Sequence, residues 1–284
     1  MVQTIAVIGA GQMGSGIAQA SAASGHNVIL NDVEERFVQK GLETIKKSLS
    51  KFVEKGKLSQ DEMTKTLGRI TTTTNVMDCA KADLVIEAVI EKADVKKAVF
   101  QKLDAAAGPK TIFATNTSSI PITEIAAATK RPDRFIGMHF MNPVPLMQLI
   151  EIIRGHETSN ETNQVIVDLA KKMGKTPVEV KDFPGFATNR ILIPFINEAF
   201  YALMEGVASA KDIDQCAKLG LNHPMGPFEL ADFVGLDTCL YVIEVMHQGF
   251  GDSKYRPCPL LRQYVQAGRL GKKVGKGVYD YPAK

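Results

Sequence analysis

The sequence predicts an α/β domain built on a parallel sheet, followed by a second domain made only of helices. Between residues 4 and 180, short apolar segments of strand length alternate with amphipathic segments of helical spacing. This order builds parallel sheets from strand–helix–strand units. After a break at residues 181–185, every periodic segment has helical spacing. We therefore expect two domains, residues 1–183 and residues 184–284.

The composition is that of an ordinary globular protein, with 284 residues of which 45% are hydrophobic and 23% charged. The net charge is only +3 and there is no run of basic residues, so we expect no nucleic-acid partner. No apolar stretch approaches the ~18 residues that cross a bilayer, so we expect no membrane association. The four cysteines form no CxxC pair, and the first strand begins at residue 4. These features predict reduced thiols, no metal site, no leader peptide and a cytoplasmic location.

A glycine-rich turn near the N-terminus is the most informative motif. The apolar run 4–8 leads directly into GAGQMG at residues 9–14, and a helical stretch follows. In such a strand–turn–helix unit, Gly9 permits the tight turn, Gly11 lets a pyrophosphate approach the backbone, and Gly14 lets helix and strand pack closely. Glycine turns also form for steric reasons alone. The order of elements here favours a Rossmann-type dinucleotide-binding domain.

A carboxylate at the end of the second strand indicates which dinucleotide is bound. The strand at residues 27–31 ends in Asp32, which lies 21 residues after Gly11. A carboxylate at this distance hydrogen-bonds the adenosine ribose hydroxyls and repels a 2′-phosphate, which favours NAD. Arg36, one helical turn further on, would offset that repulsion, so NADP stays open.

A long charged segment then interrupts the alternation of strands and helices. Residues 34–67 predict a helix that stops at Gly56 and a second helix that begins after Ser59, a suitable N-cap. The spacing is typical of a solvated helical hairpin inserted into the domain. Lys51 and Lys55 lie one turn apart and would present two cations on one side, which is the alternative of a flap over a ligand.

Two polar turns follow later strands of the predicted sheet. Residues 87–91 come after the strand at 83–87, and residues 116–119 come after the strand at 111–114. Ligands of open parallel sheets bind beyond the carboxyl ends of the strands. Ser118 in the second turn is therefore a candidate functional residue.

A histidine and a glutamate lie in two further apolar strands. His139 is near the end of the strand at 135–140, and Glu151 lies among aliphatic residues in the strand at 146–153. A buried carboxylate is costly without a partner, and a histidine on the adjacent strand is the natural one. The pair is either purely structural or a catalytic dyad in which Glu151 orients the imidazole and His139 acts as the base. The dinucleotide motif favours catalysis.

The second domain begins with a helix expected at residues 186–207, which contains Pro194 and should kink there. Asn189 precedes that kink and is a candidate substrate contact. Further helices, one of them capped by Ser209, lead to a glycine- and lysine-rich arm that we expect Tyr279 and Tyr281 to pack down. So many aliphatic and aromatic residues in about 100 positions predict a homodimer formed through this domain.

Several segments together resemble one family. The chain resembles the short-chain 3-hydroxyacyl-CoA dehydrogenases, most closely their bacterial 3-hydroxybutyryl-CoA branch. The motifs that carry the resemblance run through the whole chain in order: VIGAGQMGSGIAQ (7–19), NTSS (116–119), GMHFMNPVPLMQLIEII (137–153), DFPGFATNR (182–190), HPMGPFELADFVGLD (223–237) and GKKVGKGVYDY (271–281). The glycine motif is generic, whereas the HFMNP and PGFATNR segments are specific to the family.

The resemblance implies a role for each candidate residue. His139 matches the family's catalytic base, Glu151 its orienting carboxylate, and Ser118 and Asn189 its substrate-binding and oxyanion-stabilising residues. The inserted hairpin matches the family's coenzyme A clamp, which makes Lys51 and Lys55 candidates for the coenzyme A phosphates and reverses the preference for a merely solvated hairpin. The expected cofactor-binding residues are those of the glycine motif and its surroundings: Gly9, Gly11, Gln12, Met13, Gly14, Asp32, Glu91, Lys96 and Asn116.

The expected reaction is hydride transfer between NAD and the 3-position of a short acyl-CoA, with a homodimeric enzyme as its catalyst. Two alternatives differ from it in kind. Dehydrogenases of small β-hydroxyacids use a catalytic lysine in the second domain, and residues 185–190 contain none. A dinucleotide-binding protein without turnover would not need His139, Glu151, Ser118 and Asn189 together.

Overall fold

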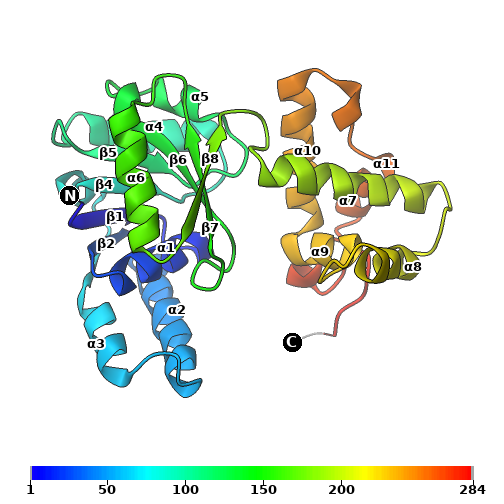
Figure 1. Cartoon of the computed structure of the whole chain (residues 1–284), viewed down its shortest axis with the longest axis horizontal. Helices are drawn as coiled ribbons and strands as arrows, with labels where there is room; N and C mark the ends of the chain where they lie inside the picture. The colour runs from blue at the N-terminus through cyan, green and yellow to red at the C-terminus, as the bar shows by residue number, and fades with distance from the viewer. Residues whose placement is uncertain (1, 283–284) are drawn as a thin grey trace. The chain divides into compact units, whose positions relative to one another are not determined.

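The computed structural model describes residues 2–282 and divides into two compact units between Asp182 and Phe183 (Figure 1). The first unit is an α/β domain, and the second is built of helices, as the sequence predicts. No helix among residues 2–282 is both long and apolar enough to cross a membrane.

The first unit is built on an eight-stranded sheet in the order β3-β2-β1-β4-β5-β6-β7-β8. Every neighbouring pair is parallel except β6 and β7, which are antiparallel. The order reverses direction at β1, which lies between β2 and β4, and that is the place where such sheets bind ligands. The strands are β1 (Thr4–Ile8), β2 (Asn27–Asn31), β3 (Ile70–Thr73), β4 (Leu84–Glu87), β5 (Ile112–Thr115), β6 (Phe135–Phe140), β7 (Leu149–Arg154) and β8 (Thr176–Lys181).

Both faces of the sheet are covered, because the central strands are apolar on both sides. On one face Ile5 and Val7 of β1 pack in one cluster with Ile17 of α1 and Ile166 of α6. On the other face Phe100 of α4 packs edge-on against Phe135 at a ring distance of 4.7 Å. The helices of this unit are α1 (Gln12–Ala23), α2 (Glu35–Glu54), α3 (Gln60–Gly68), α4 (Ala93–Asp104), α5 (Ile122–Ala126) and α6 (Asn160–Lys172).

The predicted helical insertion is confirmed by α2 and α3, which lie side by side and extend from the sheet (Figure 1). Ile45 and Leu49 form part of the buried stripe of α2. Ser59 caps α3 as predicted, since its hydroxyl accepts the Glu62 N–H at 3.2 Å while Glu62 accepts the Ser59 N–H at 2.8 Å.

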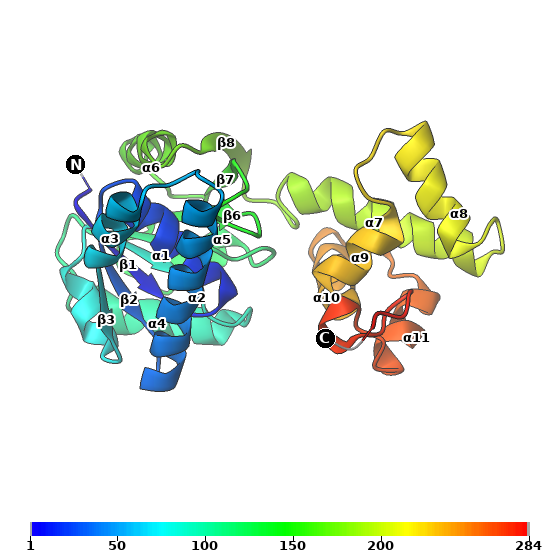
Figure 2. The same ribbon diagram turned by 90° about the horizontal axis from the view of Figure 1, so that it is seen from below.

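The second unit is organised around α7, against which α9, α10 and α11 all pack (Figure 2). Phe200 of α7 meets Phe228 of α9 edge-on at 5.1 Å in the core. Ser209 caps α8 as predicted, by accepting the Asp212 N–H. The helices are α7 (Thr188–Met204), α8 (Ala210–Gln215), α9 (Pro227–Val234), α10 (Leu236–Phe250) and α11 (Pro259–Gln266).

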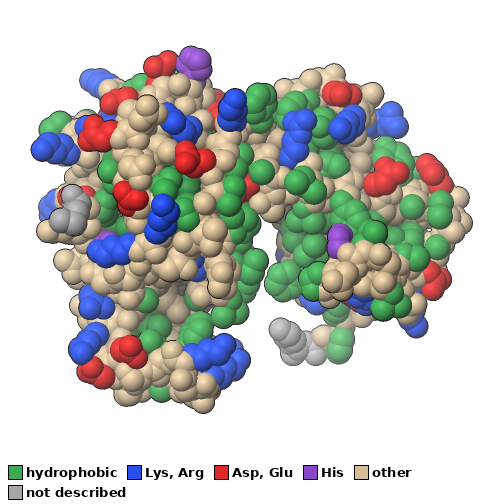
Figure 3. All heavy atoms as spheres, in the orientation of Figure 1, with side chains coloured by type: hydrophobic (Ala, Val, Ile, Leu, Met, Phe, Trp, Pro, Cys, Tyr) green, Lys and Arg blue, Asp and Glu red, His purple; other side chains and the backbone are tan. Residues whose placement is uncertain are grey.

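The C-terminal arm is pinned by its tyrosines, as predicted. The Tyr279 hydroxyl donates to Asp214 at 2.7 Å and the Tyr281 hydroxyl donates to Asp232 at 2.9 Å. Figure 3 shows that hydrophobic side chains also gather on the surface of this unit. Large hydrophobic residues of this unit that are exposed include Val207, Leu219, Leu221 and Phe233.

Several element boundaries differ from the sequence prediction. The strand expected from Leu146 begins at Leu149, because Lys175 donates to the carbonyls of Val144 and Met147 and holds this segment as a loop. The helix expected from Phe186 begins at Thr188, because Phe186 has a φ of +52°. The helix that Ser209 caps changes to a π-helical segment at Cys216–Gly220, and α5 was not predicted.

Candidate active site

The glycine turn has the close packing that its motif predicts. Gly9 has a φ of +99°, and a Cβ there would lie 2.5 Å from the Ala88 carbonyl oxygen. A Cβ at Gly14 would lie 1.7 Å from the Gly9 carbonyl oxygen, so the helix could not approach the strand with any side chain at that position. Gly11, by contrast, has nothing within 4 Å of its Cβ position. The turn therefore leaves open space beside the N-terminus of α1, where a phosphate is stabilised.

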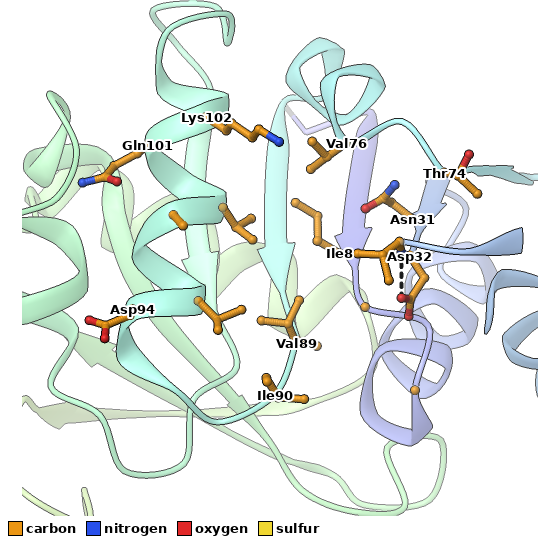
Figure 4. Close-up of a pocket in the computed structure, with 17 residues that line it drawn as sticks. Ile8, Asn31, Asp32, Thr74, Val76, Val89, Ile90, Asp94, Gln101 and Lys102 are labelled. Atoms are coloured by element: carbon orange, nitrogen blue, oxygen red, sulfur yellow. Dashed lines mark hydrogen bonds between the residues drawn. The ribbon is translucent and has the colours of Figure 1, made fainter.

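A cavity of about 1190 Å³ lies beside this turn, between the end of β2, the segment that follows β4, and α4 (Figure 4). Gly9, Gly11 and Asp32 line it at one end, and its other walls are mainly aliphatic, including Val76, Val95 and Val99. An apolar slot with a carboxylate and a glycine turn at one end suits a nucleoside joined to a pyrophosphate.

Asp32 is held in place by the backbone around it. One carboxylate oxygen accepts the Ala10 N–H at 2.7 Å, and the other accepts the Val33 N–H at 2.7 Å, the bond dashed in Figure 4. The fixed negative charge disfavours a 2′-phosphate. Arg36, the cation that would offset the charge of Asp32, forms an ion pair with Glu34 at 2.9 Å instead.

The other two side chains of the glycine motif have different surroundings. The Gln12 amide donates to Asn142 Oδ1 at 3.0 Å, which ties the start of α1 to the loop after β6. Met13 is partly buried and packs against the core of the sheet. Any contact of these two residues with the cofactor stays a prediction.

A buried charge cluster lies where β4 ends. The Lys96 ammonium is 2.7 Å from Glu87 Oε1 and 3.1 Å from Glu91 Oε2. The side chains of Lys96 and Glu87 are 1% and 0% exposed. Burial raises the pKa of Glu87 despite the nearby Lys96. Burial acts in the same direction on Glu91, but Lys96 and the hydrogen bonds of Thr117 and Ser118 outweigh it and lower that pKa.

The turn after β5 is held by Glu91. Its Oε1 accepts hydrogen bonds from the Thr117 hydroxyl at 2.5 Å, the Ser118 N–H at 2.9 Å and the Ser119 hydroxyl at 3.2 Å. Asn116 in the same turn accepts the Phe140 N–H at 2.9 Å. These bonds connect the ends of β4, β5 and β6, so the structure brings together four of the predicted site residues: Glu91, Lys96, Asn116 and Ser118.

The predicted contact between His139 and Glu151 is confirmed. The two residues are directly opposite each other on the antiparallel strands β6 and β7, and His139 Nδ1 lies 2.7 Å from Glu151 Oε2. Their side chains are 10% and 1% exposed. A carboxylate at Nδ1 favours the tautomer with a proton on that nitrogen, which leaves Nε2 as the basic position. This arrangement can exchange a proton with a ligand.

The two hairpin lysines line a small cavity. Lys51 of α2 and Lys55, the residue directly after α2, surround about 170 Å³ together with Phe52 and with Pro143 and Leu146 of the loop after β6. This loop joins the strands that carry His139 and Glu151. Lys57 also lines this cavity. Three cations over an apolar floor suit a ligand with phosphates and an aliphatic arm.

Asn189 belongs to the second unit, where it lies in the first turn of α7. Its role as a substrate-binding and oxyanion-stabilising residue stays a prediction from the resemblance.

Two residues of this region were missed in the sequence. Glu87 ends β4 and Thr117 lies in the turn, and both hold other site residues in place. A glutamate at a strand end with a lysine nine residues later was the available signal for Glu87, but only the fold shows that this lysine points inward.

Two family models match the chain, and their ranges correspond to the two units of the structure. A model of the 3-hydroxyacyl-CoA dehydrogenase NAD binding domain matches residues 4–183, and a model of the C-terminal domain of those enzymes matches residues 185–281. The chain belongs to the 3-hydroxyacyl-CoA dehydrogenase family. Its cofactor is therefore NAD, as the sequence predicts.

Individual members of the 3-hydroxyacyl-CoA dehydrogenase family match over the full chain. It is 56% identical over 283 residues to a probable 3-hydroxybutyryl-CoA dehydrogenase of Bacillus subtilis, covering 100% of this chain and 99% of the relative. It is 51% identical to a 3-hydroxybutyryl-CoA dehydrogenase of Bradyrhizobium diazoefficiens, covering 99% of this chain and 96% of that one. The solved (S)-3-hydroxybutyryl-CoA dehydrogenase of Ralstonia eutropha is 49% identical with a TM-score of 0.97, covering 100% of both chains.

Proposed function

We propose that this protein catalyses the reversible, NAD-dependent oxidation of (S)-3-hydroxybutyryl-CoA to acetoacetyl-CoA. The observation that carries the proposal is the buried His139–Glu151 pair, 2.7 Å apart in the sheet that also carries the dinucleotide cavity. Proteins named for this activity are 51–56% identical over nearly the whole chain. The four-carbon acyl group follows the names of those relatives, and the S stereochemistry follows the name of the solved Ralstonia eutropha enzyme.

His139 is the proposed proton acceptor. Its Nε2 takes the proton of the substrate 3-hydroxyl, while Nδ1 keeps its proton and donates to Glu151. The Glu151 carboxylate, 1% exposed, fixes the ring and stabilises the imidazolium that results. When bound, NAD would supply the hydride acceptor in this direction, and its reduced form, NADH, would supply the hydride donor in reverse. In the reverse direction the His139 imidazolium returns its proton to the developing alkoxide.

Ser118 and Asn189 are the proposed contacts to the reacting oxygen and the thioester. Ser118 stands in a turn that Glu91 holds through the backbone N–H at 2.9 Å and the hydroxyl at 3.3 Å. The single hydroxyl proton of Ser118, which is directed to Glu91 in this structure, would turn to the substrate oxygen and stabilise the negative charge that develops there. The side-chain amide of Asn189 is the second proposed hydrogen-bond donor.

The cavity between Lys51, Lys55 and the loop after β6 is the proposed site of the coenzyme A arm. Lys51→Ala and Lys55→Ala should each raise KM for acetoacetyl-CoA about 3- to 10-fold and leave kcat unchanged, because the lysines contact only the nonreacting part. Lys47→Ala is the matched control, since this lysine of α2 does not line the cavity. An unchanged KM in both variants would show that these lysines do not bind coenzyme A.

The activity test is NADH oxidation with acetoacetyl-CoA, with free acetoacetate, and with NADPH in place of NADH. We expect turnover with the thioester, little with the free acid, and a higher kcat/KM for NADH because of Asp32. Turnover with the free acid would favour a β-hydroxyacid dehydrogenase. Tight NADH binding without turnover of either substrate would favour a dinucleotide-binding protein that is not an enzyme.

The second unit is the proposed homodimer interface. Val207, Leu219 and Leu221 are 71%, 85% and 60% exposed, and large apolar side chains at such exposure are typical of a surface that a partner covers. Sedimentation equilibrium should give a dimer at micromolar concentration. Leu219→Lys with Leu221→Lys should give a monomer, whereas a wild-type monomer would contradict the interface.

The proposed location is the cytoplasm. All four cysteines are free thiols in the structure, and three of them are buried, which fits a reducing compartment. Fractionation of the source cells should recover the protein with cytoplasmic markers, and recovery in a secreted fraction would contradict this location.

A further inference from the structure

The ammonium of Lys175 holds a loop of the first unit. Lys175 lies directly before β8, and it donates to the backbone carbonyl of Val144 at 2.6 Å and to that of Met147 at 2.7 Å. Burial lowers the pKa of Lys175, so its ammonium has lost part of its contact with water. Hydrogen bonds from a charged donor are about twice as strong as neutral ones. The two bonds therefore restrain the segment between Val144 and Met147.

This loop covers residues 141–148 between β6 and β7, and α1 holds its first half. The Gln12 amide donates to Asn142 Oδ1 at 3.0 Å. Val144 is 2% exposed, and a Cβ at Gly16 would lie only 2.8 Å from the Val144 Cβ. The loop is therefore packed tightly against α1 as far as Val144.

The second half of the loop has little packing of its own. Leu146 and Met147 are 61% and 42% exposed. Their N–H groups both donate to the Pro143 carbonyl at 3.0 Å, which closes a turn inside the loop. Segments with few buried apolar contacts open easily. Lys175 therefore supplies a main restraint on this half of the loop.

The restrained loop forms one wall of the small cavity at the helical hairpin. Pro143, Pro145 and Leu146 line that cavity together with Lys51 and Lys55. Among the residues that the structure describes, Lys175 is not part of this lining. It can thus shape the cavity without touching a ligand inside it.

The pairing of β6 with β7 protects the dyad from movement of the loop. Phe140 and Ile150 are opposite each other at the end of this ladder, and His139 and Glu151 are opposite each other one position further in. The ladder keeps the dyad in register even if the loop shifts. A shift of the loop should therefore affect substrate binding more than the chemical step.

We propose that Lys175 is a positioning residue, which holds the second half of the 141–148 loop as a wall of the small cavity and so sets the affinity for the coenzyme A arm. The proposal rests on the proposed function for the ligand in that cavity. Lys51 and Lys55 contact the arm directly, whereas Lys175 acts through the loop.

The test compares Lys175→Met with Lys172→Met. Both lysines line a neighbouring cavity of about 390 Å³, but the Lys172 ammonium lies 3.3 Å from His26 Nε2. The control therefore removes a cation from the same wall without removing a bond to the loop. Lys175→Arg restores a charged donor and is the rescue variant. Lys175→Gln, which is uncharged and one bond shorter, replaces Lys175→Met if that variant does not fold.

Three readouts are measured on each folded variant. The first is the dissociation constant of free coenzyme A by calorimetry. The second is kcat and KM for acetoacetyl-CoA and for acetoacetyl-N-acetylcysteamine, a thioester that lacks the nucleotide and most of the arm. The third is amide hydrogen exchange of a peptide covering residues 141–149.

Lys175→Met should weaken binding of the arm and leave the chemical step intact. We expect the dissociation constant of coenzyme A and KM for acetoacetyl-CoA to rise about 5- to 20-fold, because the loosened loop must be ordered on binding. We expect kcat, and kcat/KM for the truncated thioester, to change less than about twofold. Exchange of the loop should accelerate. Lys172→Met should match wild type in all three readouts, and Lys175→Arg should recover most of the affinity.

Three results would overturn the positioning role of Lys175. Unchanged exchange at residues 141–149 would show that Lys175 does not hold the loop. An equal loss of affinity in Lys172→Met would show that positive charge, and not the position of the loop, is what matters. An equal loss of kcat/KM with the truncated thioester would show a general disturbance of the site.

Failure of the proposed function has a different signature. Wild-type protein would then neither bind free coenzyme A nor act on acetoacetyl-CoA. If wild type does both and Lys175→Met equals it, only the role of Lys175 is wrong.

Discussion

Glu151 in the first unit and Asp232 in the second are both carboxylates with 1% exposure, yet their surroundings differ. Glu151 has a histidine nitrogen 2.7 Å from one oxygen. Asp232 accepts two backbone N–H groups, from Val278 at 2.8 Å and Tyr279 at 3.0 Å, and the hydroxyl of Tyr281 at 2.9 Å. The burial of the two carboxylates is the same, but of the two only Glu151 pairs with a group of a type that exchanges protons near neutral pH.

The difference teaches that the partner, and not burial, distinguishes a functional carboxylate from a structural one. Backbone N–H groups never titrate, and burial together with Asp232 raises the pKa of Tyr281 above its ordinary value. Asp232 therefore holds the C-terminal arm in one state. An imidazole, by contrast, has two protonation states, so its hydrogen bond to the buried Glu151 carboxylate can support proton transfer.

The largest expected effect is that of His139→Ala. Removing the base should lower kcat for acetoacetyl-CoA reduction about 10²–10⁴-fold, or about 3–5 kcal/mol of barrier, with NADH binding retained. Steady-state kinetics and NADH fluorescence measure both quantities. A loss below tenfold would end the assignment of His139 as the base.

Glu151→Gln is the next test, because it keeps the shape of the side chain and removes its charge. We expect kcat to fall about 10²–10³-fold while the thermal midpoint stays within a few degrees of wild type. Kinetics and a thermal melt are needed together. If the variant unfolds instead, the pair is structural and the contrast with Asp232 disappears.

Asp232→Asn should lower stability and leave catalysis unchanged, which is the opposite of the result expected for Glu151→Gln. An amide cannot accept from both backbone N–H groups and the Tyr281 hydroxyl, so the free energy of unfolding should fall by about 1–3 kcal/mol with kcat unchanged. Urea unfolding measures the loss. Asp237→Asn is the control, since Asp237 pairs with Lys273 at a more exposed position and should change stability by less than about 1 kcal/mol. Equal losses in the two variants would contradict the anchoring role of Asp232.

The smallest effect concerns alkaline pH. Burial and the bond to Asp232 raise the pKa of Tyr281 above the ordinary value of 10. Below pH 10 the folded and unfolded states both keep the proton, so the stabilisation is complete. Above pH 10 the unfolded chain ionises first, and stability falls. Tyr281→Phe should therefore lose less stability than wild type between pH 9 and pH 11, as urea midpoints would show.

The control for this pH dependence is Tyr241→Phe, because Tyr241 is 37% exposed. Its loss of stability between pH 9 and pH 11 should equal that of wild type. An equal loss in Tyr281→Phe as well would show that ionisation of Tyr281 does not contribute.

The sequence predicted the parts of the fold and site that depend on neighbours along the chain. Gly9 and Gly14 sit in a local strand–turn–helix unit, and Ser59 caps the helix that directly follows it. His139 and Glu151 were paired because a buried carboxylate in one strand needs a partner in the next. Each of these predictions used short segments and one physical rule.

Features that depend on distant segments were missed. β7 begins three residues later than predicted because Lys175 reaches back to two carbonyls of the loop. The inward direction of Lys96 depends on Glu87 at the end of β4, and the partners of Asp232 come from the last residues of the chain. No periodicity or spacing shows such contacts, because they form only when the sheet and the arm are in place.

The most direct test of the central claim combines His139→Ala and Glu151→Gln in one protein. Hydride transfer is followed by stopped flow in a single turnover, with NADH bound before acetoacetyl-CoA is added. If the two residues act as one unit, the double variant should be no slower than His139→Ala alone. If the losses of the single variants multiply, Glu151 acts independently of His139 and the dyad account is wrong.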